Sequence, residues 1–175
     1  DYVGFHTLMA LAPAWSMANE EGNRPESALP VLKVLYRNAN RLKERGPGPD
    51  TMGPLPPVPV STENADSASV RDAARAKNLQ KADQVFAPFA NQGPNFGLDA
   101  LMEMVDDGAE VHRTVLVAKS LELSGFVGTP NAHTLLRQSV HYCVKNEASV
   151  GYVQQSLELR QVIPTLLERH HLLTP

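Results

Sequence analysis

The chain has 175 residues and a mass of 19.1 kDa; 42% of its residues are hydrophobic, 20% are charged, and its formal net charge is -3. This length predicts one domain, and so high a hydrophobic fraction with so low a net charge excludes a wholly disordered chain. No run of about 18 uninterrupted apolar residues occurs, so the sequence predicts neither a membrane-spanning helix nor a membrane partner.

Two helical segments are predicted before residue 46. Apolar side chains recur at helical spacing over residues 2–19, where Pro13 is expected to kink the segment or to start a second helix. Residues 29–45 give the clearer pattern, because Pro30 suits a first helical turn and Gly46 ends the segment. One face of this helix is apolar and consists of Val31, Leu32, Leu35, Ala39 and Leu42.

A proline-rich segment follows. Six of the fourteen prolines lie within thirteen residues, so residues 46–66 are predicted to be a long loop or linker without regular structure. Two overlapping Pro-x-x-Pro patterns within it are formed by Pro54, Pro56, Pro57 and Pro59. A linker or exposed loop is the favoured interpretation; the alternative is a polyproline II docking segment for a protein that binds proline-rich motifs.

Four further helices are predicted after the loop, over residues 67–87, 98–124, 130–145 and about 148–170. Asp66 or Ser67 is expected to cap the first, Gly108 to interrupt the second, and Pro164 to bend or restart the last. The sequence therefore predicts an all-α bundle of about six or seven helices with a long proline-rich loop between the second and third segments. Its expected organisation is an N-terminal helical segment (1–45), the loop (46–66) and a main bundle (67–175) that forms one folded unit with residues 1–45.

The helix predicted over residues 29–45 also carries a basic stripe opposite its apolar face. Lys33, Arg37, Arg41 and Arg45 follow one another at intervals of four residues, and Lys43 lies nearby. The simplest interpretation is a solvated helix face. The alternative is a contact surface for a partner protein or for the phosphate backbone of a nucleic acid.

An acidic cluster lies in the second half of the chain, within the helix predicted over residues 98–124. It consists of Glu103, Asp106, Asp107 and Glu110. Neither the Glu-x-x-His pairs of a di-iron bundle nor the spacing of an EF-hand loop is present, so no metal site is predicted. We expect a solvated face or a partner-binding face, and the latter is complementary in sign to the basic stripe.

Cys143 is the only cysteine, so an intramolecular disulfide and multi-cysteine zinc sites are excluded. Together with the lack of a positively charged leader, this predicts an intracellular, reducing compartment, with the cytoplasm as first choice, rather than secretion. The first residue is Asp1 rather than Met, which suggests a processed product or an excised domain. Cys143 is expected to be a buried thiol, because its neighbours Val140 and Val144 are apolar.

The sequence shows no nucleophile motif and no nucleotide-binding glycine pattern, so neither catalysis nor a cofactor is predicted. The leading hypothesis is a non-catalytic assembly module that self-associates or docks partners through charged helix faces and the proline-rich loop. Under this hypothesis, the basic stripe of one copy contacts the acidic cluster of the next copy in a head-to-tail arrangement. Two alternatives stay open: a nucleic-acid-binding structural protein, similar to a nucleocapsid or viral coat, and a small helical enzyme.

Overall fold

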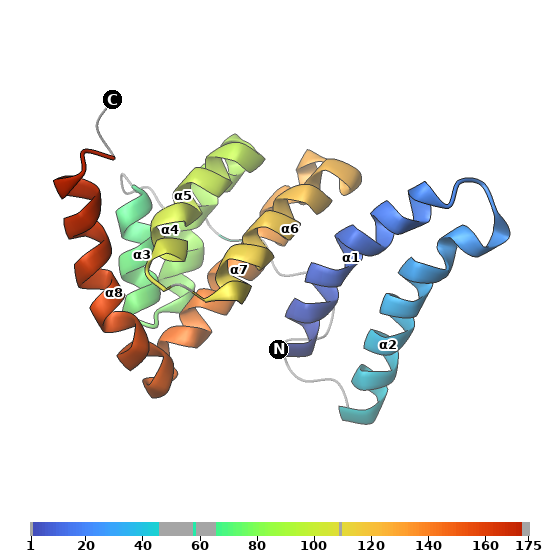
Figure 1. The fold of residues 1–175 in the computed structure, drawn as a ribbon, viewed down its shortest axis with the longest axis horizontal. Helices are drawn as coiled ribbons and strands as arrows, with labels where there is room; N and C mark the ends of the chain where they lie inside the picture. The colour runs from blue at the N-terminus through green and yellow to red at the C-terminus, as the bar shows by residue number, and fades with distance from the viewer. Residues whose placement is uncertain (1, 46–57, 59–65, 109, 173–175) are drawn as a thin grey trace.

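The computed structural model describes residues 2–45, 58, 66–108 and 110–172, and within them all regular structure is helical (Figure 1). The all-α prediction is confirmed. Eight α-helices and two short 3₁₀ helices follow in the order α1 (Tyr2–Glu20), η1 (Pro25–Ala28), α2 (Leu29–Arg45), α3 (Ser67–Arg75), α4 (Leu79–Gln92), α5 (Pro94–Asp106), α6 (Val111–Val127), η2 (Thr129–Asn131), α7 (Ala132–Glu147) and α8 (Val150–Arg169).

The helix predicted over residues 67–87 is in fact two helices, which accounts for one of the additional elements. Lys77 adopts a left-handed conformation with φ 58°, and the Asn78 side chain caps α4 by accepting a hydrogen bond from the Lys81 N–H at 3.0 Å. This break contains neither glycine nor proline. Its only signal in the sequence is Asn78, a residue type that favours helix N-termini, and it lies within a continuous apolar pattern that predicts a single helix.

Elsewhere the helix boundaries follow the sequence signals more closely. The interruption expected at Gly108 separates α5 from α6, and Asp66 caps α3 in a reciprocal capping box with Ser69. By contrast, α1 continues through Pro13 and α8 through Pro164, so neither proline starts a second helix.

The predicted proline-rich loop cannot be compared with the structure, because residues 46–57 and 59–65 lie outside the described part of the chain. Pro54, Pro56, Pro57 and Pro59 all belong to this range. The loop and the boundaries at 46 and 66 therefore stay predictions.

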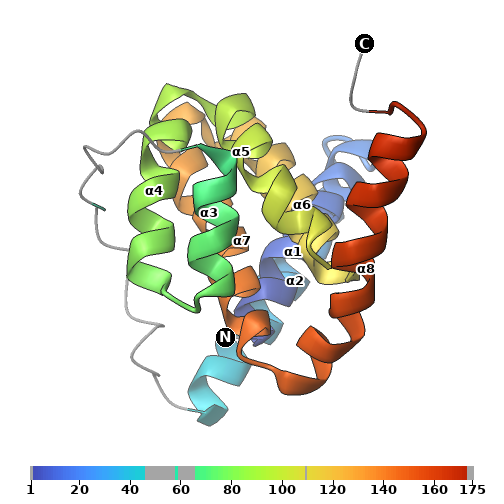
Figure 2. The same ribbon diagram turned by 90° about the vertical axis from the view of Figure 1, so that its left-hand side faces the viewer.

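The helices form an elongated arrangement with a bundle at its centre. The hairpin of α1 and α2 lies at one end of the long axis and α8 at the other (Figure 1). Between them, α3, α4, α5, α6 and α7 pack on one another, and the view along the long axis shows α3 and α4 in front of α7 (Figure 2). Within the described residues, no helix is both long and apolar enough to cross a membrane.

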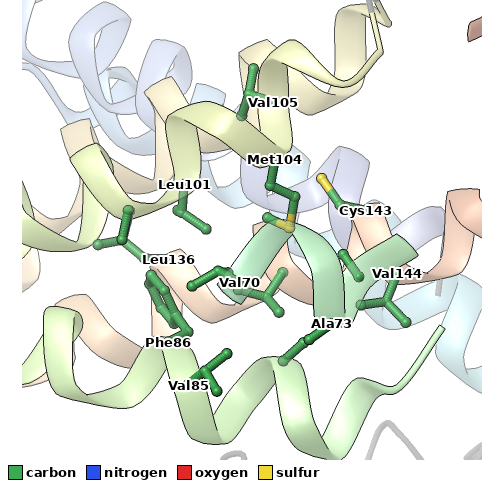
Figure 3. Close-up of a cluster of buried hydrophobic side chains, with 14 of the residues drawn as sticks. Val70, Ala73, Val85, Phe86, Leu101, Met104, Val105, Leu136, Cys143 and Val144 are labelled. Carbon is green, nitrogen blue, oxygen red and sulfur yellow. The ribbon is translucent and has the colours of Figure 1, made fainter. Parts of the chain in front are cut away.

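The main hydrophobic core fills the space among α3, α4, α5, α6 and α7 (Figure 3). Phe86, Leu101, Met104 and Leu136 are its largest fully buried apolar side chains. The expected burial of Cys143 is confirmed: the thiol is enclosed in this core, and burial raises its pKa to about 12. The thiol is therefore protonated at neutral pH, which makes it a poor nucleophile.

A close approach of α5 to α7 depends on a glycine. A methyl group at Gly97 would lie 2.9 Å from Cδ1 of Leu136 and 3.5 Å from Cζ of Phe86. Both side chains are fully buried, so neither can withdraw without disturbing the core.

A buried ionic network lies beside the core. Arg113, only 1% exposed, donates to the carbonyl oxygen of Met104 at 2.7 Å and to the carboxylate of Glu147. Arg160 of α8 donates to the same carboxylate and to the carbonyl oxygen of Asp107, and the Asp107 carboxylate accepts two hydrogen bonds from Arg75. The network thus joins α3, α5, α6, α7 and α8.

The hairpin joins the bundle through a smaller apolar cluster. Phe5 of α1 packs edge-to-face on Tyr142 of α7 with ring centroids 5.1 Å apart, and Leu116 of α6 completes the buried set. The main partner of α2 is α1, so α2 forms the outer layer of the molecule at this end (Figure 1).

The Gly97 contact gives a testable difference between two helical glycines. Gly97→Ala is expected to lower the free energy of unfolding by about 1 kcal/mol, because the overpacking exceeds the gain in helix propensity. Gly125→Ala in α6 meets no atom within 4 Å and should raise it by about 0.5 kcal/mol. Urea denaturation measures both, and equal effects at the two positions would contradict the close approach.

The ionic network predicts a large cost for removing one charge. Glu147→Gln leaves Arg113 buried without its counter-charge, and the free energy of unfolding should fall by about 3 kcal/mol. Glu20→Gln, an exposed position at the end of α1, is the matched control and should change stability by less than about 0.5 kcal/mol. If Glu147→Gln unfolds at the same urea concentration as the control, the network is not a main source of stability.

Candidate interaction surface

The leucines of the predicted apolar face of α2 point away from the protein. Leu32, Leu35 and Leu42 are 55%, 47% and 37% exposed, and Tyr36 is 68% exposed. The side that meets α1 is formed instead by Val31, Val34 and Asn38, which are half-buried. The periodicity correctly places these leucines on one side of the helix, but α1 covers a different side.

The contact between α1 and α2 includes a polar pair, which lies with Val31 and Val34 on the side of α2 that meets α1. The Thr7 hydroxyl donates to Oδ1 of Asn38 at 2.9 Å, which satisfies two polar groups that the packing of the helices partly buries. With Asn38 directed at α1, the leucines one and two turns away turn toward solvent on one flank. Arg37 and Arg41 lie on the other flank, beside Val34 and Asn38.

The basic stripe is exposed as far as the structure describes it. Lys33, Arg37, Arg41 and Lys43 are all exposed, whereas the side chain of Arg45 lies outside the described residues. None of the four exposed cations forms an ion pair with a described carboxylate. Their predicted contact with a partner or a nucleic acid stays a prediction.

An apolar cleft of about 320 Å³ continues the leucine flank toward the turn of the hairpin. Trp15, Val31 and Leu32 line it, together with small and polar residues of the turn. The Trp15 ring also contacts Phe126 of α6, with centroids 5.8 Å apart, and both rings are nearly half exposed. Apolar surface therefore extends from α2 across α1 to the end of α6.

The opposite end of the molecule also presents apolar side chains. Leu157, Val162 and Leu166 of α8 are between 40% and 49% exposed, and the main packing partner of α8 is α7. Glu158 and Glu168 are exposed on the same helix. Helix α8 is thus secured largely by the Arg160 hydrogen bonds rather than by a deep apolar seam.

Three of the four acids predicted as a partner face bind groups of this chain. Asp107 belongs to the buried ionic network, and Glu103 accepts hydrogen bonds from Ser67 at 2.6 Å and Arg71 at 2.8 Å. Glu110 caps α6. Asp106 alone is exposed; partial loss of solvation and the charges of Asp107 and Glu103 raise its pKa.

Glu110 is also at the centre of the contact between the hairpin (α1 and α2) and the bundle, a contact region that we call the joint. It accepts hydrogen bonds from the His112 ring and, at 3.0 Å, from the Tyr142 hydroxyl, while Nε2 of His112 lies 3.1 Å from Nε2 of His6 in α1. Burial raises the pKa of Glu110, but these hydrogen bonds and those from the α6 backbone outweigh it, so the pKa lies below its ordinary value.

Another buried carboxylate, apart from those of the ionic network, lies between α4 and α7. Asp83 accepts from Arg137 at 2.6 Å and lies 3.0 Å from Nε2 of His141. Burial raises the pKa of Asp83, yet the hydrogen bonds from His141 and Arg137 bring it below the ordinary value. Sequence reasoning missed this cluster, because Asp83 and His141 are 58 residues apart.

Asp83 and His141 are the residue types that form an acid–imidazole pair in many catalytic sites. Among the described residues, however, no hydroxyl or thiol is hydrogen-bonded to His141 that could serve as the nucleophile. The pair instead ties α4 to α7, as a buried charge with its partners does in many proteins. Among the described residues, no three His, Cys, Asp or Glu side chains are grouped so that they could hold a metal ion.

Comparison with known proteins adds no functional information. No protein-family model, no curated protein and no solved structure with which the chain was compared matches it. A proposal for its function must therefore come from the chemistry of its described surface, where the outer side of α2 combines unpartnered leucines with unpaired cations.

The joint predicts a specific pH dependence for Glu110→Gln. A carboxylate whose pKa is lowered by folding stabilises the protein above its ordinary value of 4.5 and loses that contribution as the pH falls through its lower folded value. The natural protein should therefore be more stable than the variant by about 1 kcal/mol at pH 7, and the difference should shrink below pH 4.5.

Urea denaturation followed by the fluorescence of Trp15, the single tryptophan, measures this difference directly. Because Trp15 packs on Phe126 across the joint, its emission reports separation of α1 from α6. A difference that stays constant from pH 7 to about pH 3 would mean that Glu110 does not stabilise the joint.

Proposed function

We propose that this protein is a non-catalytic assembly module that self-associates through the outer side of α2. The observation that carries the proposal is the exposure of Leu32, Leu35 and Leu42 on one flank of a 17-residue helix. Single exposed leucines are common on protein surfaces, but apolar residues repeated along one side of a helix form a surface suited to another helix.

A second copy of the chain is the occupant that the described surface favours, in a head-to-tail arrangement. Pairing of α2 with α2 of another copy would bring together two helices that each carry an excess of basic residues, which costs free energy. Helix α8 offers exposed apolar side chains, and its two acids, Glu158 and Glu168, balance Arg160 and Arg169, so α8 repels the basic α2 less than a second α2 would.

The positions of α2 and α8 determine what kind of assembly this contact would build. Because α2 and α8 lie at opposite ends of the molecule, each copy would keep one free end after binding (Figure 1). Such heterologous contacts build rings if the rotation closes and open filaments if it does not. This arrangement keeps the predicted head-to-tail contact and the basic surface, but α8 replaces the acidic cluster as the surface that α2 contacts.

Light scattering on a size-exclusion column tests the proposal over protein concentrations of about 10 to 200 μM, the range in which weak association is visible. The natural protein should elute as species heavier than 19.1 kDa, with masses that rise with concentration. Leu35→Glu and Leu166→Lys should each reduce association strongly, because each buries a charge in the apolar contact.

A mixture of the two variants distinguishes the head-to-tail contact from a symmetric one. Leu35→Glu retains an intact α8 and Leu166→Lys an intact α2, so the mixture should form heterodimers although neither variant associates alone. Met102→Glu, at an equally exposed position on α5, is the control and should behave as the natural protein does. A natural protein that stays at 19.1 kDa throughout, or association that neither variant weakens, would overturn the proposal.

A further inference from the structure

A second cleft lies on the basic flank of α2, away from the leucines. It has a volume of about 370 Å³ and is formed by α1 and α2 together. Its lining residues are His6, Thr7, Ala10, Val34, Arg37, Asn38 and Arg41. None of them is acidic, although acidic residues outnumber basic ones in the chain.

The two arginines of this cleft differ from most others in the described part of the chain. Six arginines each pair with a described carboxylate, namely Arg24, Arg71, Arg75, Arg113, Arg137 and Arg160. Arg37 and Arg41 have no such pair, yet they lie one helical turn apart, where like charges repel each other and destabilise a helix. An anion between them would remove this repulsion.

The floor of the cleft adds a further donor. Because Oδ1 of Asn38 accepts the hydrogen bond from Thr7, the amide N–H groups of Asn38 have no described partner. The His6 ring forms a wall whose orientation is fixed by its contact with His112 at 3.1 Å. The groups that remain for a ligand are thus two guanidinium groups and one amide, all of them donors.

We propose that this cleft binds the phosphate group of a small phosphorylated ligand. A phosphate group offers several acceptor oxygens, and arginine binds it through two parallel hydrogen bonds, so a donor-only lining with two arginines suits it. The volume exceeds the need of one phosphate group and leaves room for a small organic part beside Val34 and Ala10.

The geometry favours a small ligand over a nucleic acid. Both arginines face one cleft, whereas Lys33 and Lys43, which a long phosphate backbone would also contact, do not line it. The net charge of -3 also opposes the accumulation of a long polyanion. This site is independent of the leucine flank, so it does not require self-association.

Calorimetric titration with inorganic phosphate, pyrophosphate and ribose 5-phosphate tests the site on the full chain. Each probe should bind saturably at one site per chain, with ribose 5-phosphate tighter than phosphate alone if the organic part is held. Arg37→Gln and Arg41→Gln should each weaken binding by about tenfold or more, as expected for the loss of a charged hydrogen bond. Arg169→Gln, which removes an arginine far from the cleft, should leave the affinity unchanged.

Asn38→Asp is the sharpest variant, because it keeps the acceptor for Thr7 and changes the cleft by one charge. It should abolish binding of all three probes while the circular dichroism spectrum stays the same. The absence of saturable binding at about 20 mM of every probe, or equal affinity in all variants, would overturn the proposal.

Two further titrations distinguish this cleft from the leucine flank and from a nucleic-acid surface. Binding should persist in the Leu35→Glu variant, so a failure of self-association leaves the cleft intact, and failure of the cleft leaves the assembly result unaffected. A single-stranded oligonucleotide should bind no more tightly than ribose 5-phosphate; tight binding that weakens steeply with salt, without binding of the small probes, would replace the proposal by a nucleic-acid surface.

Discussion

The buried pair of Arg113 and Glu147 is the interaction on which the arrangement of the bundle depends. A guanidinium group removed from water must be neutralised and fully hydrogen-bonded, or the fold loses several kcal/mol. Here the carboxylate of Glu147 and the carbonyl oxygen of Met104 meet that requirement. Arg160 shares the same carboxylate, so the demand of one buried charge also fixes the position of α8.

The same need for a partner explains which charged side chains of the chain are paired internally. Three acids that the sequence places in one cluster have partners within the chain: Asp107 is buried against Arg75, Glu103 is partly exposed and pairs with Arg71, and Glu110 caps α6. The cations of α2 have no corresponding acids among the described residues. The buried charges of the bundle are therefore paired internally, while the hairpin at its end carries unpaired positive charge and exposed leucines, which is why the proposed contacts all involve α2.

The sequence predicts the helical class and several helix ends, because caps and Gly108 act locally, whereas Pro13 and Pro164 lie within helices that continue through them. Local signals fail at Lys77 and Asn78, where a break without glycine or proline lies inside an apolar pattern. They also cannot tell which side of α2 meets α1: the periodicity groups Leu35 with Leu42, whereas in the structure Asn38, bonded to Thr7, lies on the side that meets α1. The basic residues of the candidate site could be found by spacing, whereas the cleft needs α1 and α2 side by side.

Hydrogen–deuterium exchange of the full chain at two protein concentrations tests most directly whether the outer side of α2 is an assembly surface. With labelling at about 2 μM and about 200 μM, the amides of α2 and α8 should exchange more slowly at the higher concentration, because association suppresses local opening of the helices it covers. The amides of α4, which belong to the central core, should exchange at the same rate in both samples. Equal exchange of α2 and α8 at the two concentrations would contradict the account.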